Sequence, residues 1–340
     1  MTRHVTALVA LALAASAIGG AKVPAPAPKP PPAADGILNG SKAPKTIDDL
    51  KAMQERFRSI AEQVVPCTVG VRIGGGSGSG VIVSADGLVL TAAHVIGRPG
   101  RDVALILHDG RQVKGKTLGA NYGVDAGMIK IQDKGPWPFR EVGDSGALKL
   151  GAWCMATGHP AGYQPGRTPP VRVGRLLAKN ARGLVTDCML VGGDSGGPLF
   201  DMHGRIVGIH SRIGGTLSSN VHVPADTYRE TWDRLAKGEA WGARMMGPRR
   251  GGPYIGVVAD PHSDKPKIMS VQPKSPAAAA GIKQGDIITK FDGKPLKDFA
   301  ALATAVRKKK PGNKVKIEIQ RGDETLTLDL TIGKYPGPQR

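Results

Sequence analysis

Residues 192–198 read GGDSGGP, with Ser195 at the centre of the run. A serine hydroxyl is a poor nucleophile unless a neighbouring base removes its proton. Glycines on both sides allow a tight backbone in which N–H groups converge on one point, and such groups stabilise an oxyanion. A plain Gly-Ser turn is the alternative, but a strand-like segment follows the run directly. The run predicts Ser195 as a nucleophile and Gly193, Asp194 and Ser195 as its oxyanion hole.

Two upstream segments offer a base and a carboxylate to orient it. Residues 88–95, LVLTAAHV, place His94 at the end of an apolar strand, where a substrate can approach it. Residues 123–131, GVDAGMIKI, place Asp125 just before another strand. A carboxylate that bonds to a histidine ring fixes its tautomer and stabilises its charged form. The sequence therefore predicts His94 as the general base and Asp125 as its partner.

The order of these residues separates two possible folds. The spacing Gly193-x-Ser195-x-Gly197 also matches the nucleophile elbow of α/β-hydrolases. In that fold the acid and the histidine follow the serine, and helices alternate with strands. Here both precede Ser195, and residues 67–223 show short strands between Gly, Asp and Asn turns. This pattern favours an antiparallel barrel or sandwich.

The chain changes character several times along its length. Residues 1–21 combine a short basic start, an apolar run and small residues, as a cleavable signal peptide does, with an uncleaved anchor as the alternative. The apolar run is too short to span a bilayer, so we expect no transmembrane span after cleavage. We expect the following organisation: signal peptide 1–21, Pro-rich spacer 22–45, helix 46–66, first domain 67–236, linker 237–253 and second domain 254–335.

The composition limits the classes of binding partner and the expected state of the cysteines. Lys and Arg total 47 against 28 Asp and Glu, a formal charge of +19 that favours anionic surfaces. The basic residues are spread along the chain and no nucleic-acid module is recognisable, so we expect no specific nucleic-acid binding. Cys67, Cys154 and Cys188 stand among apolar neighbours and are expected as small buried side chains. Export would also permit a disulfide, with Cys154 and Cys188 as the first candidate pair.

Several segments together resemble the HtrA/Deg family of serine proteases, from about Ile73 to Gly333. The first domain carries GSG at 78–80, LTAAHV at 90–95, VDAGMIKI at 124–131, VGDS at 142–145, LGAW at 150–153, GHPAG at 158–162 and GDSGGPL at 193–199. The second domain carries YIGV at 254–257 and SPAAAAGIKQGDII at 275–288, which resemble that family's PDZ domain.

The resemblance implies a mostly β fold: a chymotrypsin-like double β-barrel followed by a small α+β PDZ domain. It implies an exported serine endopeptidase of the periplasm or cell envelope that cleaves unfolded or misfolded polypeptides, without cofactor or metal. It also implies a homotrimer or higher multiple, and part of that contact is expected from the helix at Ile47 to Val64. In the PDZ part, Tyr254, Ile255, Gly256 and Val257 are expected to bind peptide C-termini through backbone N–H groups.

The chain departs from the family at Asp194, where the family usually has Asn. Trypsin-like enzymes have Asp here, and it pairs with an N-terminal ammonium released by cleavage. No Ile-Val-Gly-Gly start precedes the first barrel in this sequence. Asp194 therefore needs another partner, with Arg172, Arg175 and Arg182 as candidates, or remains solvated.

A second departure concerns His210, which lies on a strand expected to wall the specificity pocket. The family usually has Gly-Ile-Asn, whereas bacterial glutamyl endopeptidases resemble the Gly-Ile-His of this chain. A histidine can bind a substrate carboxylate. One hypothesis is that His210 admits Glu or Asp before the scissile bond. The alternative is a structural donor that leaves a preference for small apolar residues.

Two other functions remain open from the sequence. A catalytically silent chaperone or peptide-binding scaffold could keep the same fold, although the presence of His94, Asp125 and Ser195 argues against it. A secreted digestive peptidase is the third possibility, for which a PDZ-type domain would be surplus.

Overall fold

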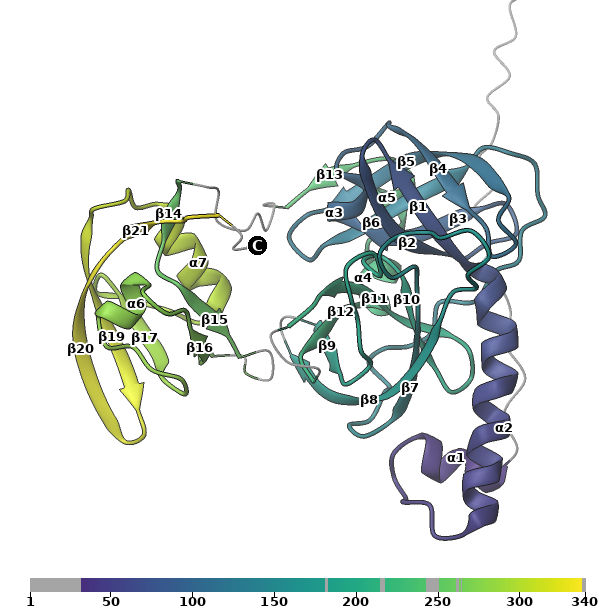
Figure 1. Cartoon of the computed structure of the whole chain (residues 1–340), viewed down its shortest axis with the longest axis horizontal. Helices are drawn as coiled ribbons and strands as arrows, with labels where there is room; N and C mark the ends of the chain where they lie inside the picture. Colours follow the sequence, from purple (N-terminus) through teal and green to yellow (C-terminus); the bar gives the residue numbers. More distant parts are fainter. Residues whose placement is uncertain are drawn as a thin grey trace, which may run out of the picture.

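In the computed structural model of the chain, two β-barrels are followed by a smaller domain of strands and helices (Figure 1). The structure describes residues 32–180, 183–214, 218–242, 251–260, 263 and 265–337. The predicted signal peptide at 1–21 lies outside the described residues. Within the described part of the chain, no helix is both long and apolar enough to cross a membrane.

The N-terminal segment is helical. Helix α1 (Pro32–Leu38) lies inside the stretch predicted as a spacer, and α2 (Ile47–Val64) runs into a short 3₁₀ turn, η1 (Val65–Cys67). The Thr46 hydroxyl accepts the Asp49 N–H (3.1 Å), and the Asp49 carboxylate accepts the Thr46 N–H (3.0 Å). This reciprocal capping box sets the start of α2. Three apolar side chains of α2, those of Met53, Ile60 and Val64, are buried.

The first barrel closes because its first and last strands in space, β5 and β6, pair with each other. Its hydrogen-bonded order is β5-β4-β1-β2-β3-β6, and all these pairings are antiparallel. The short helix α3 (Ala93–Ile96) follows β3. The strands are β1 (Thr68–Ile73), β2 (Gly76–Ile82), β3 (Leu88–Ala92), β4 (Asp102–Ile106), β5 (Gln112–Asn121) and β6 (Ala126–Ile131).

The second barrel is closed in the order β10-β11-β12-β9-β8-β7. Its strands are β7 (Trp153–Thr157), β8 (Val171–Asn180), β9 (Gly183–Thr186), β10 (Pro198–Asp201), β11 (Ile206–Arg212) and β12 (Asn220–Pro224). Helices α4 (Ala225–Glu230) and α5 (Trp232–Ala236) follow. The chain then returns to the first barrel, because β13 (Ala240–Trp241) pairs with β5. Residues up to Trp241 thus pack on the barrels, although the linker was predicted to begin at 237.

The barrel interiors are filled mainly by aliphatic side chains, as the low aromatic content predicts. One buried cluster joins α2, the first barrel and the contact between the barrels, and a second cluster fills the other barrel. All three cysteines are buried free thiols, as expected for small apolar side chains. Burial raises the pKa of Cys67 and of Cys188 to about 12 and that of Cys154 well above its usual value. These thiols are therefore packing residues.

The C-terminal domain has a core of its own, with no buried residue in common with the barrels. A four-stranded sheet in the order β18-β17-β19-β20 and the pairs β14–β21 and β15–β16 surround two helices. Asp298 caps α7 by accepting the Ala301 N–H (2.7 Å). The elements are β14 (Pro253–Tyr254), β15 (Val257–Ala259), β16 (Ile268–Val271), α6 (Pro276–Ala279), β17 (Ile287–Phe291), β18 (Lys294–Pro295), α7 (Phe299–Arg307), β19 (Lys314–Arg321), β20 (Glu324–Thr331) and β21 (Gly333–Lys334).

Candidate active site

The structure brings His94 and Asp125 into direct contact at the end of the first barrel. Their Nδ1 and Oδ2 atoms are 2.8 Å apart, and the backbone N–H of His94 donates to Asp125 Oδ1 (2.9 Å). A carboxylate oxygen only accepts, so the proton of the neutral ring sits on Nδ1 and leaves Nε2 as the basic nitrogen. The imidazole is 47% exposed, so this nitrogen can meet a substrate. The pair has the geometry of a histidine oriented for proton transfer.

Ser211 completes the support of the carboxylate and was missed by the sequence analysis. Its hydroxyl donates to Asp125 Oδ2 (2.6 Å), so one carboxylate oxygen holds both the imidazole and this serine. Asp125 itself has a positive φ of 69°, a conformation that non-glycine residues adopt when the surroundings hold them there. The signal that could have indicated Ser211 is its place immediately after His210 on the predicted pocket strand.

Ser195 lies in the loop that leads into β10, so the second barrel contributes it. Its carbonyl accepts the Ser79 N–H (2.7 Å), which fastens the loop to β2 of the first barrel. Among the described residues, the Ser195 hydroxyl makes no direct hydrogen bond to the His94 ring. Such nucleophile–base bonds are often looser in the absence of substrate.

Two backbone N–H groups beside Ser195 are available for an anion. The Gly192 carbonyl accepts the Ala161 N–H (2.6 Å), and across a trans peptide the Gly193 N–H points the opposite way. The Asp194 N–H donates to Val191 O (3.1 Å) and is thus engaged. Within the described ranges, the N–H groups of Gly193 and Ser195 donate to no protein acceptor.

Position 193 of the nucleophile loop accepts only glycine. Its φ is +98°, and a Cβ built there would lie 2.5 Å from the His159 carbonyl oxygen. Both facts exclude a side chain. The backbone at the candidate oxyanion hole is therefore fixed by the sequence at this position.

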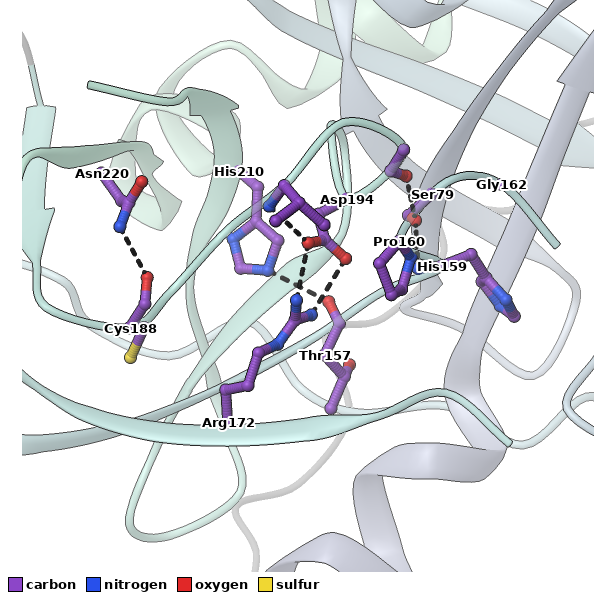
Figure 2. Close-up of polar contacts among 12 residues, drawn as sticks. Ser79, Thr157, His159, Pro160, Gly162, Arg172, Cys188, Asp194, His210 and Asn220 are labelled. Atoms are coloured by element: carbon purple, nitrogen blue, oxygen red, sulfur yellow. Dashed lines mark hydrogen bonds and ion pairs between the residues drawn. The ribbon is translucent and has the colours of Figure 1, made fainter. Parts of the chain in front are cut away.

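Asp194 is fully buried and paired with Arg172, one of the three candidates from the sequence (Figure 2). Arg172 Nη1 lies 2.6 Å from Asp194 Oδ2, and Nη2 lies 2.9 Å from Oδ1. The Val191 N–H adds a third bond to Oδ2 (2.9 Å). Arg175 instead lies 3.8 Å from Asp187 at the surface. Arg182 lies outside the described residues.

His210 lies behind the nucleophile loop, and both of its ring nitrogens are engaged. Nε2 lies 3.0 Å from the Thr157 carbonyl oxygen, and Nδ1 lies 2.9 Å from Nδ1 of His222. A carbonyl only accepts, so His210 donates from Nε2 and accepts from His222 at Nδ1. His222 Nε2 then accepts the Thr186 hydroxyl (2.7 Å). This relay leaves His210 no nitrogen for a substrate carboxylate.

Burial keeps the two relay histidines neutral. Burial, with a smaller contribution from the positive charge of Arg172, lowers the pKa of His210 to about 3. Burial also lowers the pKa of His222 well below its usual value, with a smaller contribution from His210. The geometry therefore favours the alternative in which His210 is a structural donor.

The hollow beside Ser195 is small, and aliphatic residues line it together with polar and charged ones. Leu190, Val191 and Ile213 contribute aliphatic surface, and Val191 and Ile213 are 42% and 50% exposed. Ser211 and Arg212 line it as well. The aliphatic part of this lining can contact a small apolar side chain of a substrate.

The four residues predicted to bind peptide C-termini line a groove against α7. Leu302 and Val306 of α7 line the same groove, and so do residues of the second barrel, among them Val221 and Val223. In the described part of the chain, the N–H groups of Ile255 and Gly256 donate to no protein acceptor. Gly256 has a φ of +85°, and a Cβ there would lie 2.2 Å from Ser275 Cβ, so this turn requires glycine.

Comparisons with known proteins agree with this architecture. Residues 78–209 match the trypsin-like peptidase domain family, and residues 253–332 match the PDZ domain family. A probable periplasmic serine endoprotease DegP-like of Halomonas elongata is 32% identical over 77% of this chain and 57% of its own length. The protein of the same name in Pseudomonas fulva is 30% identical over 86% of this chain and 64% of its own length. Among solved structures, the HtrA-type protease AlgW with a tripeptide is 24% identical, covers 83% of this chain and 98% of its own, and has a TM-score of 0.48.

A closed pair of six-stranded barrels with His94, Asp125 and Ser195 at their junction defines a trypsin-like peptidase architecture. With the PDZ domain that follows, the chain belongs to the HtrA/Deg family. It spans about 57 to 64% of the length of the curated relatives compared here.

Proposed function

We propose that this protein is an exported serine endopeptidase that cleaves unfolded or misfolded polypeptides and recognises peptide C-termini through its PDZ domain. The observation that carries the proposal is the His94–Asp125 pair at 2.8 Å, together with two unpartnered N–H groups, of Gly193 and Ser195, in the described residues. Hydrolysis of casein by the purified chain, blocked by a fluorophosphonate, tests it. The substitution series that assigns the residues is given in the Discussion.

The proposed acylation step uses each of these groups once. The Ser195 hydroxyl attacks the scissile carbonyl while His94 Nε2 takes its proton, and Asp125 stabilises the imidazolium through the bond to Nδ1. The carbonyl oxygen becomes an oxyanion that accepts hydrogen bonds from the Gly193 and Ser195 N–H groups. His94 then gives its proton to the leaving amine, and the acyl group remains on Ser195.

Deacylation repeats the same steps with water. His94 Nε2 removes a proton from a water molecule as that water attacks the acyl carbonyl. The second oxyanion forms in the same place, and its collapse returns the proton from His94 to Ser195. Both steps use only His94, Asp125, Ser195 and the two backbone N–H groups.

We expect the pocket beside Ser195 to select small apolar residues before the scissile bond. Cleavage of a peptide library should favour Val, Ala or Leu over Glu and Asp, because three aliphatic side chains line the pocket and the relay occupies both ring nitrogens of His210. His210→Asn should keep this preference, since both ring nitrogens of His210 bond within the protein and neither is available to a substrate carboxylate. A preference for Glu that disappears in His210→Asn would contradict the structural role of His210.

The PDZ groove is proposed to bind a free C-terminal carboxylate at the Ile255 and Gly256 N–H groups. A peptide with a free apolar C-terminus should bind at least about 10-fold more tightly than its amidated form, because the amide loses charge-assisted bonds. Fluorescence anisotropy with the Ser195→Ala protein measures both affinities without cleavage. Equal binding of the two peptides would contradict the carboxylate site, and Gly256→Ala is the matched variant expected to lose the difference.

Localisation and assembly are part of the proposal. The curated relatives are named periplasmic, and the expected signal peptide at 1–21 supports export. Ile47 and Leu50 on α2 are 72% and 55% exposed, and such apolar surface favours burial against further copies of the chain. We expect a trimer, or a multiple of it, in sedimentation velocity; a monomer at micromolar concentration would contradict this assembly.

A further inference from the structure

We propose that Arg172 is an internal counter-ion that orders the nucleophile loop, residues 192–195, so that the oxyanion hole forms without cleavage of the chain. Arg172 touches neither substrate nor the reacting atoms and is therefore a positioning residue. The inference rests on the proposed peptidase function. It starts from the buried ion pair between Arg172 and Asp194.

The pair is built as an anchor. The Asp194 carboxylate is 0% exposed and the Arg172 side chain is 15% exposed, so water screens the ion pair only weakly. Both carboxylate oxygens bond to the guanidinium in parallel, at 2.6 and 2.9 Å. Such a two-point bond fixes direction as well as distance. Removal of the arginine alone would leave an uncompensated buried charge, which is strongly unfavourable.

The surroundings of Asp194 are shaped for this contact. A Cβ on Gly158 would lie 2.6 Å from Asp194 Oδ1, so the carboxylate packs directly against the backbone at that glycine. The Val191 N–H closes the other side by donating to Oδ2. Arg172 fills the place of the cation, and Figure 2 shows its guanidinium facing the carboxylate from the neighbouring strand. No second cation is needed to neutralise Asp194.

Asp194 lies between the two residues whose N–H groups remain available. The loop is otherwise held through its carbonyls: Ala161 N–H donates to Gly192 O (2.6 Å), Ser79 Oγ to Gly193 O (2.8 Å) and Ser79 N–H to Ser195 O (2.7 Å). Of these contacts, the ion pair is the one that a side chain of the loop itself makes. Without it, the peptide between Gly192 and Gly193 could turn and point the Gly193 N–H away from the oxyanion.

Arg172 also stands where the loop at 158–170 enters β8. That loop reaches the nucleophile loop a second time, through the Ala161 N–H. The two contacts hold both ends of the candidate oxyanion hole from the same segment. The conformation of the loop at 158–170 therefore affects the geometry of the oxyanion hole through the contacts of Arg172 and Ala161.

The test measures catalysis separately from folding. Arg172→Gln is expected to lower kcat on a short peptide about 10²- to 10³-fold, the loss expected when an oxyanion donor is misplaced, with a much smaller change in KM. Affinity for a peptide boronate, which forms a tetrahedral adduct with Ser195, should fall with kcat. Arg172→Lys should recover part of the activity, because it restores the charge but not the two-point bond.

A double variant keeps the proposal testable if the single change impairs folding. Arg172→Gln with Asp194→Asn removes both charges and leaves two amides that can bond to each other. It should recover kcat to within about 10-fold of the wild type if a neutral pair holds the loop. Arg175→Gln, on the same strand but 54% exposed, is the matched control and should leave kcat unchanged.

The outcomes separate this inference from the proposed function. A folded Arg172→Gln protein with wild-type kcat would overturn the inference while the peptidase function stands. So would a folded double variant as inactive as Arg172→Gln. Failure of the wild type to hydrolyse peptides or to react with a fluorophosphonate would instead remove the proposed function. Thermal unfolding of each variant shows which proteins are folded.

Discussion

Ser195→Ala is expected to lower kcat for casein or a short peptide by on the order of 10⁶, to the level left by the oxyanion hole alone. The loss is this large because the nucleophile, the base and the orienting carboxylate act as a unit. His94→Ala should cost about as much, and Asp125→Asn about 10⁴, because an amide favours the wrong tautomer of His94. KM should change little, since none of these substitutions alters the apolar pocket.

Labelling by a fluorophosphonate provides the matched measurement. The wild type should react once per chain, at Ser195, and Ser195→Ala should not react. Ser145→Ala is a suitable control, because this serine is buried beside α4 and bonds to Asp226 N–H. Wild-type turnover in highly purified Ser195→Ala protein would remove Ser195 from the mechanism.

The fold and the three reacting residues could be predicted because their signals are local. Ser195 stands among glycines in a run of seven, and His94 and Asp125 flank strands that the apolar pattern marks clearly. These residues depend on short-range backbone geometry, which short motifs encode. Their meeting point depends on barrel closure, and the structure brings His94 to Asp125 through the pairing of β3 with β6.

Short sequence motifs could not identify the partner of Asp194. Three arginines were candidates, and the strand period distinguishes two of them, since side chains two residues apart share a face. Leu176 is fully buried and Val173 is 36% exposed, so Arg172 shares the inward face with Leu176 and Arg175 the outward face with Val173. Arg172 is the partner because its side chain lies on the inward face of β8. The sequence did not show which face of this strand is inward, because the strand contains two arginines among its apolar residues.

The role of His210 depended on register, which the sequence does not specify. His210 and His222 stand directly opposite each other on β11 and β12. The connection between these strands is long enough to permit other registers. The observed register places the Nδ1 atoms of the two rings 2.9 Å apart and engages the nitrogen that a substrate carboxylate would have required.

Buried neutral histidines lead to the second large prediction, a steep loss of stability in acid. Burial, with a smaller contribution from the charge of Arg167, lowers the pKa of His159 to about 4. Burial is also the main cause that lowers the pKa of His210 to about 3 and that of His222 well below its usual value. In the unfolded chain each has a pKa near 6.5, so below that pH the unfolded state binds protons that the folded state does not. Stability is therefore complete above pH 6.5 and falls as the pH decreases.

The expected slope is about 1.4 kcal/mol per pH unit for each histidine, or about 4 kcal/mol per unit for the three between roughly pH 6 and 4. A loss of about 8 kcal/mol over that range approaches the whole stability of an ordinary domain. Guanidinium unfolding of the Ser195→Ala protein at several pH values measures the slope. His159→Phe should lower it by about one proton, because neither nitrogen of this buried ring has a hydrogen-bond partner in the described residues. Replacement of the exposed His108 by Gln should leave the slope unchanged. Stability that stays flat from pH 7 to pH 4.5 would show that these histidines are protonated in the folded chain, and the neutral His210–His222 relay would then be wrong.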